Sequence, residues 1–251
     1  MNSLTLAVDS SSENLQLALL DEKQVLVEIS LALSQPHSQN LMTAIDWVLE
    51  RAGVDSSLIE RLAVGCGPGA FSGLRIGMAS MQGLAQALDK PLYTFMAHDL
   101  LALKFAWQTG NIAILTDARR QQIYWSSYLS EGCNLTRLTS CQVNGPADLV
   151  AQLPETDILL AGSGVAKYQD ELAELLPDAT LLGTSFAQLD LGFIAEMSVI
   201  NDLDTGRVGL KSAGKNLEPL YVRPSDAEIN LRKKLDREKL DQDKLKEKSN
   251  G

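Results

Sequence analysis

The fold is decided by the stretch Val64-Gly65-Cys66-Gly67-Pro68-Gly69-Ala70-Phe71-Ser72-Gly73-Leu74-Arg75-Ile76-Gly77. A short apolar run, Leu62–Val64, leads into it and predicts a buried strand. The turn Gly67–Gly69 ends that strand, because its proline has no N–H to donate and glycine accepts the positive φ of a sharp turn. Ser72 is then a favourable N-cap for a helix that we expect to end near Leu88.

A strand, a glycine turn and a helix can together form a phosphate cradle, in which free backbone N–H groups face an anion. Gly67, Gly69 and Gly73 do not have the spacing of the dinucleotide-binding fingerprint, and no Gly-Lys-Ser/Thr follows them as in a P-loop. Taken alone, these glycines favour a tight turn with close packing over a ligand site.

The predicted helix after the turn has two distinct faces, each with spacings of three and four residues. One face carries the larger apolar residues, which are Leu74, Met78, Met81, Ala85 and Leu88. The other carries small residues, which are Gly73, Gly77, Ser80, Gly83 and Ala87. Interior glycines cost about 1 kcal/mol each relative to alanine, so close approach of another helix would explain them. Either the helix lies at the centre of a two-layer core, or a partner chain covers part of it.

The composition indicates a globular protein with an acidic surface. Its 251 residues are enough for one large domain or for two of about 120 residues. The net charge is −10, and residues 226–251 hold eight basic and seven acidic residues, which leaves about −11 on the rest. Because an acidic surface repels phosphate groups, we do not expect the chain to bind nucleic acid unaided.

No stretch approaches the roughly 18 apolar residues of a membrane span, and the N-terminus lacks the basic and apolar regions of a signal segment. We therefore expect a cytoplasmic protein without membrane association. Cys66, Cys133 and Cys141 are odd in number and have no C-x-x-C spacing, which indicates reduced, structural thiols.

Both halves of the sequence follow one order of elements, namely a strand hairpin, a helix, a strand, a glycine turn and a helix. The strands expected in the first half are 4–8, 15–20, 25–29, 62–66 and 92–96, with helices at 36–52, 72–88 and 99–107. The strands expected in the second half are 111–115, 123–129 and 157–161, with helices at 148–152, 165–176 and, from a capping box, 185–203. Two βββαβα-like lobes of this kind are typical of the α/β superfold shared by actin, hexokinase and the heat-shock chaperone ATPases.

The domain boundaries follow from this order. We place the first lobe at 1–108, with part of 204–225 packing on it, and the second lobe at 109–203. The last segment, 226–251, is rich in charge and poor in apolar residues, so we expect a frayed or disordered tail.

Residues that would support catalysis or metal binding are mostly missing. His37 and His98 are the only histidines, and neither belongs to an H-x-x-x-H or H-E-x-x-H motif. No G-x-S-x-G elbow surrounds a serine. We expect neither a metal site nor a Ser-His-Asp triad.

The remaining candidates for a nucleotide site are turn residues. Asp9 and Ser10 follow the first strand, where actin-like proteins hold phosphate and metal, and Gly162 and Gly164 precede a helix. The turn at Asp9 has no glycine, so hydrogen bonds to its own backbone explain its residues equally well. A further charged turn can bind an anion or form a local ion pair, and its residues are Asp117, Arg119 and Arg120.

The sequence resembles the TsaB (YeaZ) family of bacterial proteins over nearly its whole length. The strongest match is Gly67–Gly77, which is close to the family's G-P-G-S-F-T-G-L-R-I-G, with Ala70 and Ser72 in place of the usual Ser and Thr. Weaker matches follow in the family's order at Val8–Ser11, His37-Ser38, Asp117–Arg119, Gly162–Gly164 with Tyr168, Pro219–Arg223 and Ala227-Glu228. Gln39 stands where an acidic residue is expected, and the charged tail is an extension.

The resemblance implies a degenerate actin-like fold and a role in making threonylcarbamoyladenosine in tRNA. TsaB proteins are paralogues of the catalytic subunit TsaD without its metal-binding histidines, so it also implies no catalytic site, metal site or cofactor in the isolated chain. They bind TsaD and, with it, the ATPase TsaE, and the assembly moves a threonylcarbamoyl group to adenosine 37 of tRNAs that read codons beginning with A. ATP or ADP is expected only at the complex with TsaD, and tRNA only through the complex.

Family members also form homodimers through helices of the first lobe, which correspond here to 38–52 and 72–88. The residues expected at an interface with TsaD or a second copy are Leu41, Ile45, Val48, Leu74, Arg75, Gly77, Met78, Ser80 and Met81. The alternative function is an active ATP-dependent phosphotransferase or ATPase of the same superfold, with Asp9 and the turn Gly162–Gly164 as phosphate ligands.

Overall fold

The computed structural model describes residues 3–22, 24–32, 37–132, 134–154, 157–183, 186–200, 206–213 and 217–223, without the side chains of His37 and Ser38. The predictions for Cys133, for a cap at Ser185 and for the charged tail lie outside these residues. Both sheets belong to one compact unit, Met1–Leu220. No helix within the described residues is long and apolar enough to cross a membrane.

The first sheet has seven strands in the order β12-β13-β5-β4-β1-β2-β3. Its strands are β1 (Leu4–Asp9), β2 (Asn14–Asp21), β3 (Gln24–Ala32), β4 (Ile59–Gly65), β5 (Leu92–Phe95), β12 (Val199–Ile200) and β13 (Leu210–Ser212). The first three strands form an antiparallel meander, and β4 lies parallel to both β1 and β5. The strand β1 is buried on both faces, which explains why it has apolar residues on both, such as Leu6 and Ala7.

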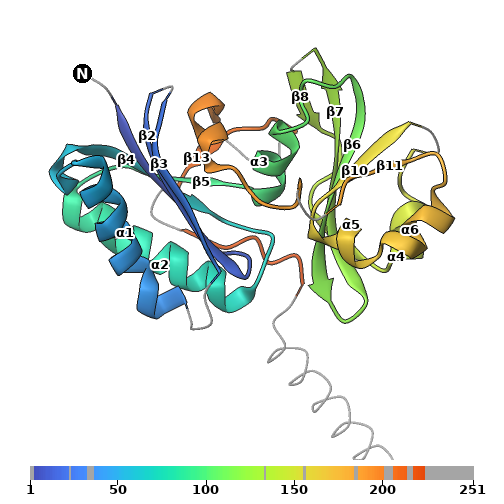
Figure 1. Cartoon of the computed structure of the whole chain (residues 1–251), viewed down its shortest axis with the longest axis horizontal. Helices are drawn as coiled ribbons and strands as arrows, with labels where there is room; N and C mark the ends of the chain where they lie inside the picture. The colour runs from blue at the N-terminus through green and yellow to red at the C-terminus, as the bar shows by residue number, and fades with distance from the viewer. Residues whose placement is uncertain are drawn as a thin grey trace, which may run out of the picture. The chain divides into compact units, whose positions relative to one another are not determined.

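Two helices, α1 (His37–Ala52) and α2 (Phe71–Leu88), lie side by side on one face of this sheet (Figure 1). A short 3-10 helix, η1 (Ser56–Leu58), joins α1 to β4. The core between helices and sheet includes Leu6, Val8, Leu15, Leu17, Leu41, Ile45, Val48, Met78 and Met81. The helix contributions recur every three or four residues and the strand contributions every two, as the sequence pattern predicted.

The predicted N-cap of α2 is wrong by two residues. The helix begins at Phe71, its N-cap is Ala70, and the Leu74 N–H donates the first helical hydrogen bond to the Ala70 carbonyl at 3.0 Å. The Ala70 N–H is itself held by the Ser11 carbonyl at 2.7 Å, so a contact with the β1–β2 turn determines where the helix starts. Its predicted end at Leu88 is confirmed.

The second sheet repeats the strand order of the first. Its order is β11-β10-β6-β7-β8, and β9 also pairs with β7. The strands are β6 (Gly110–Arg119), β7 (Gln122–Glu131), β8 (Asn134–Arg137), β9 (Gln142–Asn144), β10 (Ile158–Ala161) and β11 (Thr180–Leu181). In each sheet an antiparallel meander is followed by two parallel strands on the other side of its first strand. This duplication confirms the predicted actin-like α/β fold with two βββαβα-like lobes.

The helices of the second lobe differ from the predicted ones, since the helix predicted at 148–152 begins two residues earlier and the one predicted at 165–176 is divided in two. They are α4 (Pro146–Val150), α5 (Ser163–Lys167) and α6 (Gln169–Leu175). The single helix predicted at 165–176 is divided at Tyr168, whose φ of −113° and ψ of 26° are not helical. The apolar periodicity continues across the break because Val165 and Leu172 pack into the same core.

The helix predicted at 185–203 is wrong. The chain instead forms a 3-10 helix, η3 (Leu191–Glu196), followed by β12. The Leu191 N–H donates to Glu28 Oε1 at 2.7 Å, and Leu191, Ile194 and Met197 pack with Ala7 and Ala18 on the sheet face opposite α1 and α2. The predicted second-lobe boundary at 203 is therefore too late, because residues 191–200 belong to the first lobe. Further along, β13 pairs with β5.

The helix α3 (Ala97–Leu103) links the two sheets, and it begins and ends earlier than the predicted range 99–107. Its first six residues are all buried. It packs on both lobes, since Leu100 contacts the core behind the first sheet while Leu101 and Ala102 contact residues of β6 and β10.

Candidate functional site

The glycine turn after β4 receives the turn between β1 and β2. A Cβ atom on Gly69 would overlap the Ser11 carbonyl, and one on Gly65 would overlap Asp9 Oδ2. Among Gly65, Gly67 and Gly69, the positive φ belongs to Gly67, at +113°. Gly65 and Gly69 are therefore explained by close approach of another part of the chain.

Ser10 extends the same packing into α2. Its Oγ donates a hydrogen bond of 2.9 Å to the Gly73 carbonyl. A Cβ atom on Gly77, one helical turn later, would overlap that same Oγ. We call Gly65, Gly69, Gly73 and Gly77 the glycine socket, because together they accommodate Asp9, Ser10 and Ser11.

Asp9 is fully buried, and its carboxylate folds back onto its own turn. Asp9 Oδ1 accepts hydrogen bonds from the Ser11 N–H at 3.0 Å and from Ser11 Oγ at 2.8 Å. This geometry satisfies the backbone of the turn in the way predicted for turn residues. In the described chain, Asp9 and Ser10 contribute to the contact between the β1–β2 turn and the glycine socket.

Gly162 and Gly164 have the same kind of role in the second lobe. Gly162 has a φ of +112°, and a Cβ atom there would overlap the Leu115 carbonyl of β6. A Cβ atom on Gly164 would lie 3.0 Å from the Leu115 carbonyl carbon. Both glycines let the start of α5 pack directly on β6.

The charged turn between β6 and β7 forms ion pairs with residues that are distant in the sequence. Asp117 Oδ2 lies 2.7 Å from Lys167 Nζ, and Asp117 Oδ1 accepts from the Arg119 N–H at 2.8 Å. The hydrogen bond from Lys167 to Asp117, together with the negative charge of Asp117, raises the pKa of Lys167. Arg119 Nη2 pairs with Glu13 of the first lobe at 3.1 Å, with both side chains exposed. Exposed pairs of this kind contribute little to stability.

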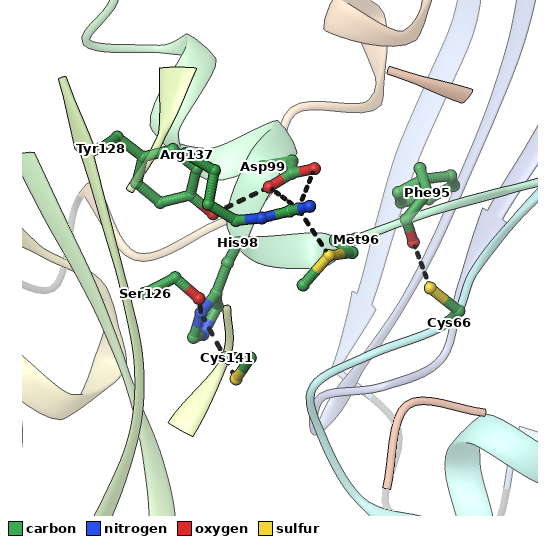
Figure 2. A network of polar contacts seen from close by, with 9 residues as sticks. All are labelled: Cys66, Phe95, Met96, His98, Asp99, Ser126, Tyr128, Arg137 and Cys141. Carbon is green, nitrogen blue, oxygen red and sulfur yellow. Dashed lines mark hydrogen bonds and ion pairs between the residues drawn. The ribbon is translucent and has the colours of Figure 1, made fainter. Parts of the chain in front are cut away.

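A cluster of buried polar residues joins the lobes, and it was not predicted from the sequence (Figure 2). From α3, His98 Nδ1 lies 2.9 Å from Ser126 Oγ, and His98 Nε2 lies 2.9 Å from Thr116 Oγ1. Burial lowers the pKa of His98 to about 3, with a smaller contribution from the positive charge of Arg137. His98 is therefore a neutral, hydrogen-bonded side chain of the core at neutral pH.

The next residue of α3, Asp99, forms a buried ion pair with the second lobe. Arg137 Nη1 lies 2.8 Å from each carboxylate oxygen of Asp99, and the Tyr128 hydroxyl donates to Asp99 Oδ1 at 2.9 Å (Figure 2). Burial raises the pKa of Asp99 to about 6, although Arg137 and Tyr128 act in the opposite direction. We call His98, Asp99, Thr116, Ser126, Tyr128 and Arg137 the interlobe cluster.

The two described cysteines are free thiols. Cys66 is buried beside the glycine turn and donates a hydrogen bond of 3.2 Å to the Phe95 carbonyl (Figure 2). Burial raises the pKa of both Cys66 and Cys141 to about 12, so neither forms a reactive thiolate at neutral pH. Within the described residues, no group of three His, Cys, Asp or Glu side chains is placed to hold a metal ion.

The structure changes which residues can form a surface on α1 and α2. Most of the residues expected at a partner interface are buried in the lobe's own core, and these are Leu41, Ile45, Val48, Leu74, Met78 and Met81. Gly77 is covered by Ser10. Arg75 is exposed, with its guanidinium 3.9 Å from the Phe71 ring centroid, and Ser80 is half-buried.

The surface of the two helices consists of other residues. Met42 and Trp47 of α1 are each 46% exposed. On α2, Ala79, Gln82, Gly83, Gln86 and Ala87 are exposed, and a Cβ atom on Gly83 would meet open space. We call Met42, Trp47, Ala79, Gly83 and Ala87 the outer helix face. Sequence periodicity divides each helix into faces, and packing against the sheet decides which of them is exposed.

Comparison with known proteins agrees with this arrangement. The family model described as TsaD, tRNA N6-adenosine threonylcarbamoyltransferase, matches residues 30–205. The tRNA threonylcarbamoyladenosine biosynthesis protein TsaB of Haemophilus influenzae is 28% identical in an alignment 239 residues long, which covers 89% of this chain and 95% of that protein. The chain belongs to the TsaD family and is of the TsaB (YeaZ) type.

Two further proteins are similar to this chain. TsaB of Bacillus subtilis is 29% identical and covers 72% of this chain and 80% of its own length. The solved structure of YeaZ from Pseudomonas aeruginosa is 30% identical, with a TM-score of 0.60 over 68% of this chain and 80% of that one. The resemblance stated from the sequence is thereby confirmed.

Proposed function

We propose that the chain is a non-catalytic subunit in the formation of threonylcarbamoyladenosine in tRNA, and that it acts by binding TsaD through the outer helix face. Its TsaB relatives are named for this biosynthesis, and the family model that matches it is that of the transferase TsaD. Modification of tRNA by such an assembly takes place in the cytoplasm. The ATPase TsaE and tRNA engage the assembly of this chain with TsaD, and the acidic charge of the chain disfavours direct tRNA binding.

The observation that carries the proposal is the composition of the outer helix face. After Arg75, α2 has no charged residue up to its end at Leu88, although five of its residues in that span are exposed. The neighbouring α1 exposes a tryptophan and a methionine. Depletion of charge together with exposed aromatic and methionine side chains is typical of the buried centre of protein interfaces. Small side chains at Ala79, Gly83 and Ala87 let another helix approach closely.

The proposed lack of catalysis is supported by what the candidate residues do in the fold. Asp9 and Ser10 pack into the glycine socket, and Gly162 and Gly164 pack on Leu115. A chain without a cofactor of its own can still contribute to an ATP or ADP site formed at the seam with TsaD.

The test measures binding to TsaD by two chains that carry the same substitution at different places. Ala79→Arg adds a long charged side chain to the outer helix face, whereas Ala173→Arg adds it to an exposed position of α6 in the second lobe. We expect Ala79→Arg to weaken TsaD binding at least about tenfold, which is 1.4 kcal/mol, and Ala173→Arg to leave it unchanged. Titration calorimetry provides the affinities, and sizing chromatography shows whether each variant also forms homodimers.

Equal affinities of the two variants would move the TsaD interface away from this face. ATP hydrolysis by the isolated chain, abolished by Asp9→Ala in a variant that remains folded, would instead establish the alternative ATP-using enzyme. Gly77 is not a suitable position for the binding test, because a side chain there would disturb Ser10 inside the lobe.

A further inference from the structure

The helix α3 is shared by the cores of both lobes. On one side, Leu100 packs with Phe95, Ile194 and Leu210, all of which belong to the first lobe. On the other side, Leu101, Ala102 and Phe105 pack with residues of the second sheet, which are Ile112, Ile114, Tyr128, Leu159 and Ala161. Separation of the lobes would therefore expose apolar surface of α3 to water.

The interlobe cluster adds buried polar contacts to this apolar junction. Two adjacent residues of α3, His98 and Asp99, make hydrogen bonds to side chains of β7 and β8 (Figure 2). His98 also makes one to Thr116 of β6. The side chains of Asp99 and Arg137 are 0% and 2% exposed. Withdrawing one member of a buried ion pair leaves the other charge buried without compensation, which is among the most destabilising single changes in a protein.

Arg137 connects β8 to the first lobe twice. Its guanidinium binds Asp99 and lies 2.7 Å from Met96 Sδ. Its backbone N–H donates to the Gly206 carbonyl at 2.7 Å, and β8 also forms an isolated bridge between Thr136 and Arg207. The segment that begins at Gly206 runs into β13, which pairs with β5 of the first sheet. One residue of the second lobe is thus bound to α3 and to the segment leading into β13.

We propose that Arg137 fastens the two lobes into a single cooperative body, so that the folded chain opens and unfolds as one unit and its lobes do not move apart independently. Arg137 acts here as a positioning residue, because its contacts hold Asp99, Met96 and Gly206 in place. The property is intrinsic to the chain and does not depend on any partner.

Native-state hydrogen exchange at neutral pH tests this, because the slowest amides of a cooperative unit exchange through one common opening. The first-lobe reporters are the amides of β1, and the second-lobe reporters are those of β10. In the unmodified chain we expect the protection factors of the slowest amides in both strands to agree within about threefold. In Arg137→Met, we expect protection in β10 to fall at least about tenfold more than in β1.

A control variant weakens the second lobe without touching Arg137. Leu160 is fully buried in the core of the second lobe, away from α3. Leu160→Ala should lower the protection of β1 and β10 by the same factor, because both strands unfold together. In the Arg137→Met background, the same Leu160→Ala change should lower only the protection of β10.

Two results would overturn the proposal. One is an unmodified chain whose lobes already differ by more than about tenfold in protection. The other is an Arg137→Met variant in which both lobes lose protection equally, which would assign the coupling to the apolar residues of α3. If Arg137→Met does not fold, Arg137→Lys is measured by the same criterion, since lysine keeps the positive charge but lacks the guanidinium whose Nη1 contacts both Asp99 and Met96.

Discussion

The hydroxyl of Ser10 donates a hydrogen bond of 2.9 Å to the Gly73 carbonyl, 63 positions later in the chain. This bond ties the β1–β2 turn to the first turn of α2 and lies next to Gly77, where no side chain could fit. The glycine turn that resembles a phosphate cradle in sequence is therefore filled by the protein's own turn.

Ser10→Ala should lower the free energy of unfolding by about 1 kcal/mol, because a buried hydrogen bond is lost. Ser12 lies in the same turn, but its hydroxyl bonds the backbone of Asn14 in an exposed position. Ser12→Ala should therefore change the stability by less than about 0.5 kcal/mol. Urea unfolding of both variants measures the difference. An equal loss in the two variants would show that the contact with Gly73 has no special weight.

Two glycines of α2 should respond to alanine in opposite directions. Gly77→Ala should destabilise the chain by about 1–3 kcal/mol, because the new methyl group overlaps Ser10 Oγ. Gly83→Ala should stabilise it by about 0.5–1 kcal/mol, because the position is open and alanine favours a helix. The double variant Ser10→Ala/Gly77→Ala should lose less than the sum of the single losses, since the overlapping oxygen is gone. Thermal unfolding of the four chains tests this, and additive losses would contradict the proposed overlap.

Gly162→Ala should be severely destabilising, by at least about 3 kcal/mol, because a positive φ and overlap with a carbonyl act together. The overlapping atom belongs to the backbone of Leu115 in β6, which cannot rotate away. Gly183 is the matched control, since nothing lies within 4 Å of a Cβ atom there. Circular dichroism during urea unfolding compares the two variants, and a tolerated alanine at Gly162 would refute the close contact.

His98 should make stability depend on pH. Its pKa is about 3 in the folded chain and about 6.5 when unfolded, so the unfolded chain binds the extra proton between these values. The stabilisation that neutral His98 contributes to the fold is complete above about pH 6.5 and is lost as the pH falls toward about 3. Relative to His98→Gln, the stability of the unmodified chain should fall by up to about 1.4 kcal/mol per pH unit below pH 6.

Urea unfolding of the two chains at pH 7, 6, 5 and 4 provides this difference. Asp99 titrates in both chains, so its opposite contribution, from a pKa raised to about 6, largely cancels in the comparison. A stability difference that stays constant with pH would show that His98 is not held neutral in the fold.

Much of the fold follows from local sequence patterns. The stripe Leu41, Ile45, Val48 predicts α1, and the alternation in β1 and β2 predicts the first hairpin, because each pattern repeats at the period of its own backbone. The helix predicted at 185–203 was wrong because it was inferred from a local capping box, whereas packing on the first sheet decides the conformation of this segment. The apolar residues Leu191, Ile194 and Met197 have helical spacing, but a 3-10 helix packed on the first sheet also places them in the core.

The candidate sites were less predictable than the fold. Nothing near Asp99 in the sequence indicates that its partner is Arg137, 38 positions away in another lobe. Likewise, the residues expected at a partner interface were taken from the apolar stripes of α1 and α2, and most of those stripes face the core. A stripe shows that one face of a helix is covered, but the sheet beneath decides which face that is.

The glycine turn shows where the two kinds of information divide. The sequence by itself determined that a strand ends before Gly67, that a helix ends near Leu88 and that the chain is of the TsaB type, because these depend on residues adjacent along the chain. Only the tertiary structure decided what the glycines accommodate, since Ser10 and Ser11 meet them through the pairing of β1 with β4. The glycines in the sequence indicate that another group packs closely against them. The folded chain shows that this group is the protein's own β1–β2 turn.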